Sequence, residues 1–99
     1  MTSKTDDLFS VRVRISGRVQ GVGYRAWAQH NASALGLSGW VRNCWDGAVE
    51  ALFSGPQSSV VEMLARCRQG PRSAFVEDVA ILEEGAAAPS GFRVLPTRG

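Results

Sequence analysis

Residues 9–25 read FSVRVRISGRVQGVGYR, and the fold is most clearly indicated by this segment. In its first half, apolar residues at the odd positions from 9 to 15 alternate with serines and arginines. This period of two predicts a half-buried strand with one wet, basic face. A loop punctuated by glycines follows over residues 17–23. From Tyr24 to about Leu35 the composition becomes helical, and Gly36 is placed to cap that helix. The stretch therefore predicts a strand, a glycine loop and a helix in direct succession.

Two strands and a second helix are predicted next along the chain. Residues 39–45 and 48–54 have a strand-like composition, and Asp46-Gly47 between them is typical of a tight hairpin turn in which both residues take positive φ. The helix is predicted to open with a capping box at residues 59–62, SVVE, and to end at Gly70-Pro71.

The last predicted elements complete the order of the fold. A fourth strand from Ala74 to about Leu82, with a bulge at Glu77-Asp78, precedes a loop at residues 85–90 and a short strand at residues 92–95. The order is therefore β-α-β-β-α-β plus a terminal strand. It predicts an α+β fold of the ferredoxin-like, split βαβ type, which is an antiparallel sheet with two helices on one face. Enzymes, RNA-binding domains and metal chaperones share this fold, so the loops must indicate the function.

The length and charge of the chain limit the classes of protein to which it can belong. Ninety-nine residues fit one domain, predicted to span residues 8–99 behind a disordered tail at residues 1–7. The net charge of +2 is too small and scattered to favour nucleic acid. All the basic residues except Lys4 are arginines, which suit phosphate groups, although a GC-rich genome would give the same bias. No apolar run approaches the ~18 residues of a membrane span. Without an evident exposed apolar stripe, a monomer with no membrane contact is expected.

The cysteines and the histidine limit the available chemistry. Cys44 and Cys67 lie far apart without the spacing of metal ligands, which indicates free thiols in a reducing compartment. A packed thiol is favoured over a redox switch at Cys44. His30 is the only histidine, which nearly excludes a zinc site, and it is interpreted as a surface residue. The polar, acidic N-terminus is unlike a secretory signal, so a cytoplasmic protein is expected.

The loop between the first strand and the first helix has the properties of an anion site. Glycines at 17, 21 and 23 let several backbone N–H groups face one point, and the loop runs into a helix N-terminus that favours negative charge. Arg25 in the first helical turn opposes the helix dipole by roughly 0.3–1 kcal/mol, which makes sense if a bound anion recruits it. Two alternatives to an anion site remain open. The glycines then only allow a tight connection between strand and helix, and Arg25 is then an arginine exposed to solvent.

Asn43 stands near the end of the second predicted strand, where a weak strand former is unexpected. It also suits a position leading into the turn at residues 46–47. In the predicted topology, however, the second strand runs parallel to the first. Its C-terminal end then lies at the same edge of the sheet as the glycine loop, and Asn43 is placed to reach a group held there.

Three motifs resemble the acylphosphatase family. Residues 17–25, GRVQGVGYR, are similar to its first signature. Residues 35–43, LGLSGWVRN, followed by DGAVE at 46–50, are similar to its second signature. Residues 70–76 also resemble the family's approach to the fourth strand. The resemblance covers about residues 9–95.

The resemblance implies an activity and a site. The family's members are small cytosolic hydrolases of acyl phosphates that use neither metal nor cofactor. Arg25 and the loop would hold the phosphoryl group, and Asn43 would orient the attacking water. The loop residues are Val19, Gln20, Gly21, Val22, Gly23 and Tyr24. Phenylalanine is also common at position 24, so the hydroxyl of Tyr24 is expected to contribute little.

Two other functions are compatible with the sequence. An RNA-binding domain shares the element order, and Arg12 and Arg14 make the outer face of the first strand basic, but that face offers no aromatic side chain for base stacking. Trp27 and Trp40 are interpreted as core aromatics. The second alternative is a domain at the front of a larger carbamoyl-transfer maturation protein, although a tail at each end favours a free-standing enzyme.

Overall fold

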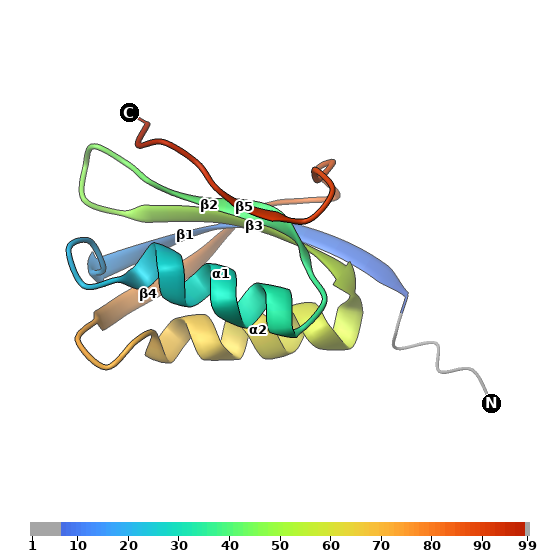
Figure 1. Cartoon of the computed structure of the whole chain (residues 1–99), viewed down its shortest axis with the longest axis horizontal. Helices are drawn as coiled ribbons and strands as arrows, with labels where there is room; N and C mark the ends of the chain where they lie inside the picture. Colours follow the sequence, from blue (N-terminus) through green and yellow to red (C-terminus); the bar gives the residue numbers. More distant parts are fainter. Residues whose placement is uncertain (1–6, 99) are drawn as a thin grey trace.

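The computed structural model describes residues 7–98, which form a sheet with two helices on one face (Figure 1). The strands are β1 (Leu8–Arg18), β2 (Ser38–Asn43), β3 (Val49–Pro56), β4 (Phe75–Glu84) and β5 (Phe92–Val94). The helices are α1 (Tyr24–Ala34) and α2 (Gln57–Gln69). The predicted element order is therefore confirmed. The predicted disordered tail lies outside the described residues except for Asp7, whose carbonyl accepts a hydrogen bond from the N–H of Gln57 (2.9 Å).

The sheet has the strand order β4-β1-β3-β2-β5. β1 pairs antiparallel with β3 and β4, and β2 pairs antiparallel with β3, which is the ferredoxin-like, split βαβ arrangement. The predicted α+β fold is therefore confirmed. β5 joins β2 in parallel, with Gly39 opposite Phe92 and Val41 opposite Val94, so the complete sheet is mixed and not wholly antiparallel.

The hydrophobic core lies between the sheet and the helices. β1 contributes every second residue, and each helix contributes residues three or four apart, because these spacings place side chains on one face. The buried residues of the three elements are Val11, Val13, Ile15, Tyr24, Ala28, Ala32, Val60, Met63 and Cys67. The alternation in residues 9–15 therefore predicted the buried face of β1 correctly.

Charged side chains on the opposite, open face of the sheet are paired with one another. Glu50 on β3 is 9% exposed and accepts hydrogen bonds from Arg42 (2.7 Å) and from Arg12. Arg14 pairs with Asp46 (2.8 Å). The face predicted to be basic is therefore largely neutralised by carboxylates, which weakens the case for RNA binding.

The interpretation of Trp27 and Trp40 as core residues is correct for the first and wrong for the second. Trp27 packs against the core. Trp40 lies opposite Leu52 on the open face, where the guanidinium of Arg42 is 4.4 Å from the centre of its ring. The buried neighbour Val41 points toward the helices, so alternation along β2 directs Trp40 the other way.

The turn between β2 and β3 is wider than predicted. Asp46 does not take positive φ, whereas Gly47 does (100°). The N–H of Gly47 donates to the carbonyl of Cys44 (3.1 Å), and the N–H of Cys44 donates to the carbonyl of Ala48 (2.8 Å). A carboxylate oxygen of Asp46 accepts from the N–H of Ala48 (3.1 Å). This local hydrogen bond stabilises the turn without a left-handed backbone at the aspartate.

The predicted capping box of the second helix is wrong. α2 begins at Gln57, its N-cap residue is Pro56, and no side chain caps it. The carbonyl of Asp7 pairs the first N–H of the helix instead, so Ser59 lies inside the first turn. The predicted end of α2 at Gly70 is confirmed, because Gly70 is its C-cap residue with a φ of 68°.

β4 contains the predicted bulge. Ser16 pairs with Asp78 and Gly17 pairs with Val76, which leaves Glu77 as an extra residue on β4.

No helix in residues 7–98 has the length and hydropathy needed to cross a bilayer.

Candidate active site

β1 and β2 end at the same edge of the sheet. Both are antiparallel to β3 and hence parallel to each other, so their last residues, Arg18 and Asn43, lie at one end of the sheet. The loop of residues 19–23 leaves β1 at this edge and leads into α1 (Figure 1). The topology thus brings the glycine loop close to Asn43.

Two glycines give the loop its backbone path. φ is 74° at Gly21 and 80° at Gly23, and a Cβ at either position would meet nothing within 4 Å, so conformation and not space requires glycine there. Gly17 serves another purpose, because a Cβ at this position would lie 2.2 Å from the carbonyl oxygen of Phe75. Gly17 therefore permits the close packing of β1 on β4, and the other two glycines shape the loop.

The N–H groups of the loop and of the first helical turn are unpaired. Within the described range 7–98, no N–H from Gln20 to Ala26 donates a hydrogen bond. Gly23 is the N-cap residue of α1, no side chain caps this end, and its first turn carries no acidic residue. Unpaired N–H groups and the positive end of the helix dipole together favour a bound anion.

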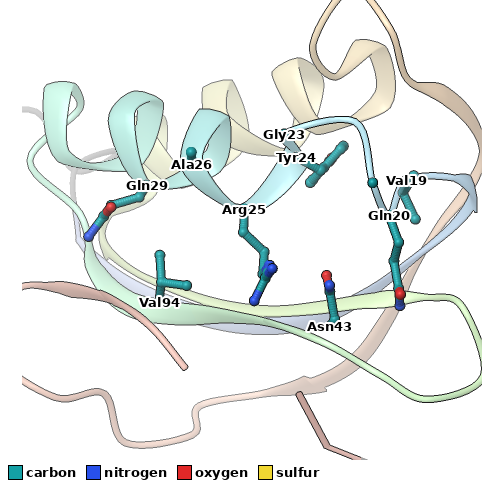
Figure 2. A pocket seen from close by; sticks show the side chains of 10 residues that line it. Val19, Gln20, Gly23, Tyr24, Arg25, Ala26, Gln29, Asn43 and Val94 are labelled. Atoms are coloured by element: carbon teal, nitrogen blue, oxygen red, sulfur yellow. The ribbon is translucent and has the colours of Figure 1, made fainter. Parts of the chain in front are cut away.

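A cavity of about 330 Å³ lies over these N–H groups. Its walls are formed by Val19, Gln20, Gly21, Gly23, Tyr24, Arg25, Ala26, Gln29, Asn43 and Val94. In Figure 2 the side chains of Arg25, from α1, and Asn43, from β2, both reach into this space. The guanidinium of Arg25 has no carboxylate partner in the described part of the chain. Of the residues predicted for the site, Val22 is absent from the walls, because it packs against the core.

Tyr24 is 2% exposed and links the start of α1 to the end of α2. Its hydroxyl donates a hydrogen bond to the carbonyl of Cys67 (2.8 Å), and burial raises the pKa of this hydroxyl. In a continuing helix that carbonyl would pair with the N–H of residue 71, but residue 71 is proline and has none. The sequence did not predict this structural contact, in which the hydroxyl satisfies a buried carbonyl.

The side chain of Gln20 connects the loop to the β2–β3 turn. Its Nε2 donates to the carbonyl of Cys44 (2.6 Å) and to the carbonyl of Ala48 (2.7 Å). From the sequence, Gln20 is expected to act only through its backbone N–H. Neither carbonyl is marked by its residue type, so the sequence offered no local signal for this contact.

The C-terminal segment extends the sheet beside Asn43. The N–H of Leu95 donates to the carbonyl of Val41 (2.9 Å), and the N–H of Arg98 donates to the carbonyl of Asn43 (2.9 Å). The carbonyl of Arg98 accepts from the N–H of Trp45 (3.0 Å). Val94, in the same segment, contributes a wall of the cavity that the sequence did not predict.

The cysteines and the histidine stand apart from this chemistry. Cys67 is fully buried, and burial raises the pKa of its thiol to about 12. Burial also raises the pKa of Cys44, which disfavours a reactive thiolate. Both cysteines are free, and His30 is exposed, as predicted.

Known proteins resemble the chain over most of its length. A sequence model of the acylphosphatase family matches residues 11–94. A Rhodospirillum rubrum protein named acylphosphatase is 53% identical over 85 residues, which cover 86% of this chain and 93% of the relative. A Rhizobium meliloti protein of the same name is 51% identical over 96 residues, which cover 96% of this chain and 99% of the relative. The structure of an acylphosphatase from Coxiella burnetii has a TM-score of 0.85 at 35% identity, over 96% of this chain and all of that one. The chain therefore belongs to the acylphosphatase family.

Proposed function

We propose that this chain hydrolyses the carboxyl–phosphate anhydride bond of acyl phosphates and releases a carboxylate and inorganic phosphate. The observation that carries the proposal is that the guanidinium of Arg25, the amide of Asn43 and the unpaired N–H groups of the glycine loop share a cavity. The relatives named acylphosphatase support the same reaction.

The phosphoryl group binds at the positive end of α1. Loop N–H groups from Gln20 to Tyr24 donate hydrogen bonds to its oxygens, and the planar guanidinium of Arg25 donates two more in parallel. The helix dipole contributes roughly 0.3–1 kcal/mol at an anion placed there. These groups stabilise the charge on the transferring phosphoryl oxygens, and phosphoryl transfer depends mainly on such stabilisation and on positioning.

Asn43 orients the water that attacks phosphorus. Its side-chain carbonyl oxygen accepts a hydrogen bond from the water and holds it opposite the leaving group. A bond forms between the water oxygen and phosphorus while the bond from phosphorus to the acyl oxygen breaks, and the electron pair leaves with the carboxylate. A carboxylate with an ordinary pKa of about 4 departs without being protonated. The proton of the water passes to the product phosphate or to solvent.

The acyl group occupies the part of the cavity formed by Ala26, Gln29 and Val94. Ala26 and Val94 provide apolar surface, and Gln29 provides an amide whose nitrogen also donates to the carbonyl of Phe92 (3.3 Å). An uncharged acyl group suits these walls better than a charged one, because none of the three side chains would compensate a second charge.

The proposed reaction uses neither metal nor cofactor, because Arg25 and the loop N–H groups supply the charge stabilisation. A cytoplasmic, monomeric enzyme is part of the same proposal, and the two free thiols support a reducing compartment. Light scattering coupled to size exclusion tests the monomer. A stable dimer at micromolar concentration would contradict this part alone.

Hydrolysis of benzoyl phosphate in the presence of EDTA tests the reaction and its residues. We expect turnover by the wild type, and a loss in kcat/KM of about 10²–10³-fold for Arg25→Ala, because the transition state loses its cation. Asn43→Ala should lower kcat by about 10²-fold, because the water is no longer aligned. Arg72→Ala, which removes an exposed arginine, is the matched control and should behave as the wild type.

Circular dichroism confirms that each variant is folded. A folded wild type without turnover would refute the proposed reaction. Turnover abolished by EDTA would refute the metal-free mechanism, and full activity in either site variant would remove that residue from the catalytic pair.

A further inference from the structure

We infer that the side chain of Gln20 is a positioning residue that keeps the phosphate-binding loop in register with Asn43. The inference rests on the proposed function. Nε2 of Gln20 donates to the carbonyl oxygens of Cys44 (2.6 Å) and Ala48 (2.7 Å). These carbonyls flank the β2–β3 turn, and Cys44 directly follows Asn43 in the chain.

The surroundings of Gln20 determine how its amide is oriented. Two carbonyl oxygens face the same end of the side chain, so that end must be the NH₂ group, and both of its hydrogens are used. The opposite orientation would place the amide oxygen against two acceptors. The distance to the carbonyl of Ala48 lies at the short end of the range for N–H···O hydrogen bonds, and the distance to the carbonyl of Cys44 lies just below it. The side chain is therefore held in one orientation.

Other contacts support each half of the site separately. Val19 is 1% exposed and Val22 packs against the core, which attaches the loop to the interior of the domain. Asn43 is paired with Val49 of β3, and its carbonyl accepts from the N–H of Arg98. Among the hydrogen bonds of residues 7–98, the two donated by Gln20 join the loop to the chain around Asn43. Gln20 thus connects the part that would hold phosphorus with the part that would hold the water.

Removal of the two hydrogen bonds donated by Gln20 should therefore slow the chemical step selectively. In-line attack requires the water and the phosphorus to be aligned, and a misplacement of about 1 Å costs roughly 10²-fold in rate. The loop N–H groups and Arg25 do not depend on the amide of Gln20 for their hydrogen bonds to a phosphoryl group. Loss of the amide should therefore lower kcat more than it weakens phosphate binding.

Gln20→Met tests the inference, because methionine keeps the length of the side chain and removes both donors. With benzoyl phosphate we expect kcat to fall by about 10–100-fold. The inhibition constant of inorganic phosphate should stay within roughly threefold of the wild type, because ground-state binding is retained. Gln69→Met, at the exposed end of α2, is the matched control and should leave both constants unchanged.

Gln20→Glu provides a second test that does not depend on the folding of the methionine variant. At neutral pH its carboxylate faces two carbonyl oxygens and donates nothing. When it takes up a proton at acid pH, one donor returns, so kcat relative to the wild type should rise as the pH falls toward the ordinary pKa of about 4.3. A purely structural role predicts a ratio that does not change with pH.

Three results would overturn the inference. They are an unchanged kcat in folded Gln20→Met, equal losses in kcat and phosphate affinity, and a flat pH ratio for Gln20→Glu. Wild-type turnover is measured first in the same assay. Its absence would count against the proposed function, whereas normal wild-type turnover with an unaffected Gln20→Met would count against the positioning role alone.

Discussion

Replacement of Tyr24 by phenylalanine removes one oxygen atom from the interior of the protein. The ring keeps its packing, including the contact with Trp27 at 5.2 Å between ring centres. The carbonyl of Cys67, however, loses the hydroxyl that donates to it at 2.8 Å, and Pro71 offers no N–H in its place. A buried acceptor left without a partner costs about 1–3 kcal/mol. In a domain of this size each kcal/mol corresponds to roughly 4–8 °C in Tm, so Tyr24→Phe should lower Tm by at least about 4 °C.

Urea unfolding followed by circular dichroism measures this effect. We expect a lower midpoint with an unchanged slope, because the change affects the free energy of unfolding and not the surface exposed. Turnover of benzoyl phosphate should stay close to that of the wild type, since the hydroxyl points toward α2 and away from Arg25. A midpoint equal to that of the wild type would refute the argument that this hydroxyl satisfies the carbonyl of Cys67.

Two further predictions concern charge and the acyl wall. Burial acts to raise the pKa of Glu50, but hydrogen bonds from Arg42 and Arg12 outweigh it and keep the pKa below 4.5. The contribution of the Glu50 carboxylate to stability is therefore complete above that pH and is lost as the pH falls through the folded pKa. The urea midpoint of Glu50→Gln should decline less steeply from pH 5 to 3 than the midpoint of the wild type. Parallel declines in the two proteins would contradict a stabilising role of the ionised carboxylate. Val94→Ala should lower kcat/KM about tenfold for benzoyl phosphate, because apolar contact is lost. Acetyl phosphate should be affected much less, and an equal loss for both substrates would exclude Val94 from the acyl wall.

Local sequence signals failed where a second local or tertiary contact competed with them. Asp46-Gly47 predicted a tight turn, but the aspartate carboxylate accepts from the N–H of Ala48 and stabilises a wider turn. The predicted capping box at residues 59–62 does not form, because the helix begins earlier, where the N–H of Gln57 donates a hydrogen bond to the carbonyl of Asp7. In each case one hydrogen bond that the local pattern does not indicate is present in the structure.

The amino-acid pattern alone was enough to predict the order of the elements, the buried face of β1, the glycine loop and the position of Arg25 and Asn43 at one edge of the sheet. These follow from periodicity, from turn residues and from the parallel direction that a β-α-β connection gives its two strands, all of which are set by neighbouring segments of the chain. The contacts that support the site depend on how the folded chain packs. Gln20 reaches carbonyls 24 and 28 residues away, and Tyr24 reaches a carbonyl 43 residues away. Every residue carries a backbone carbonyl, so no residue type marks such a partner, and only the packed chain selects which one a side chain meets.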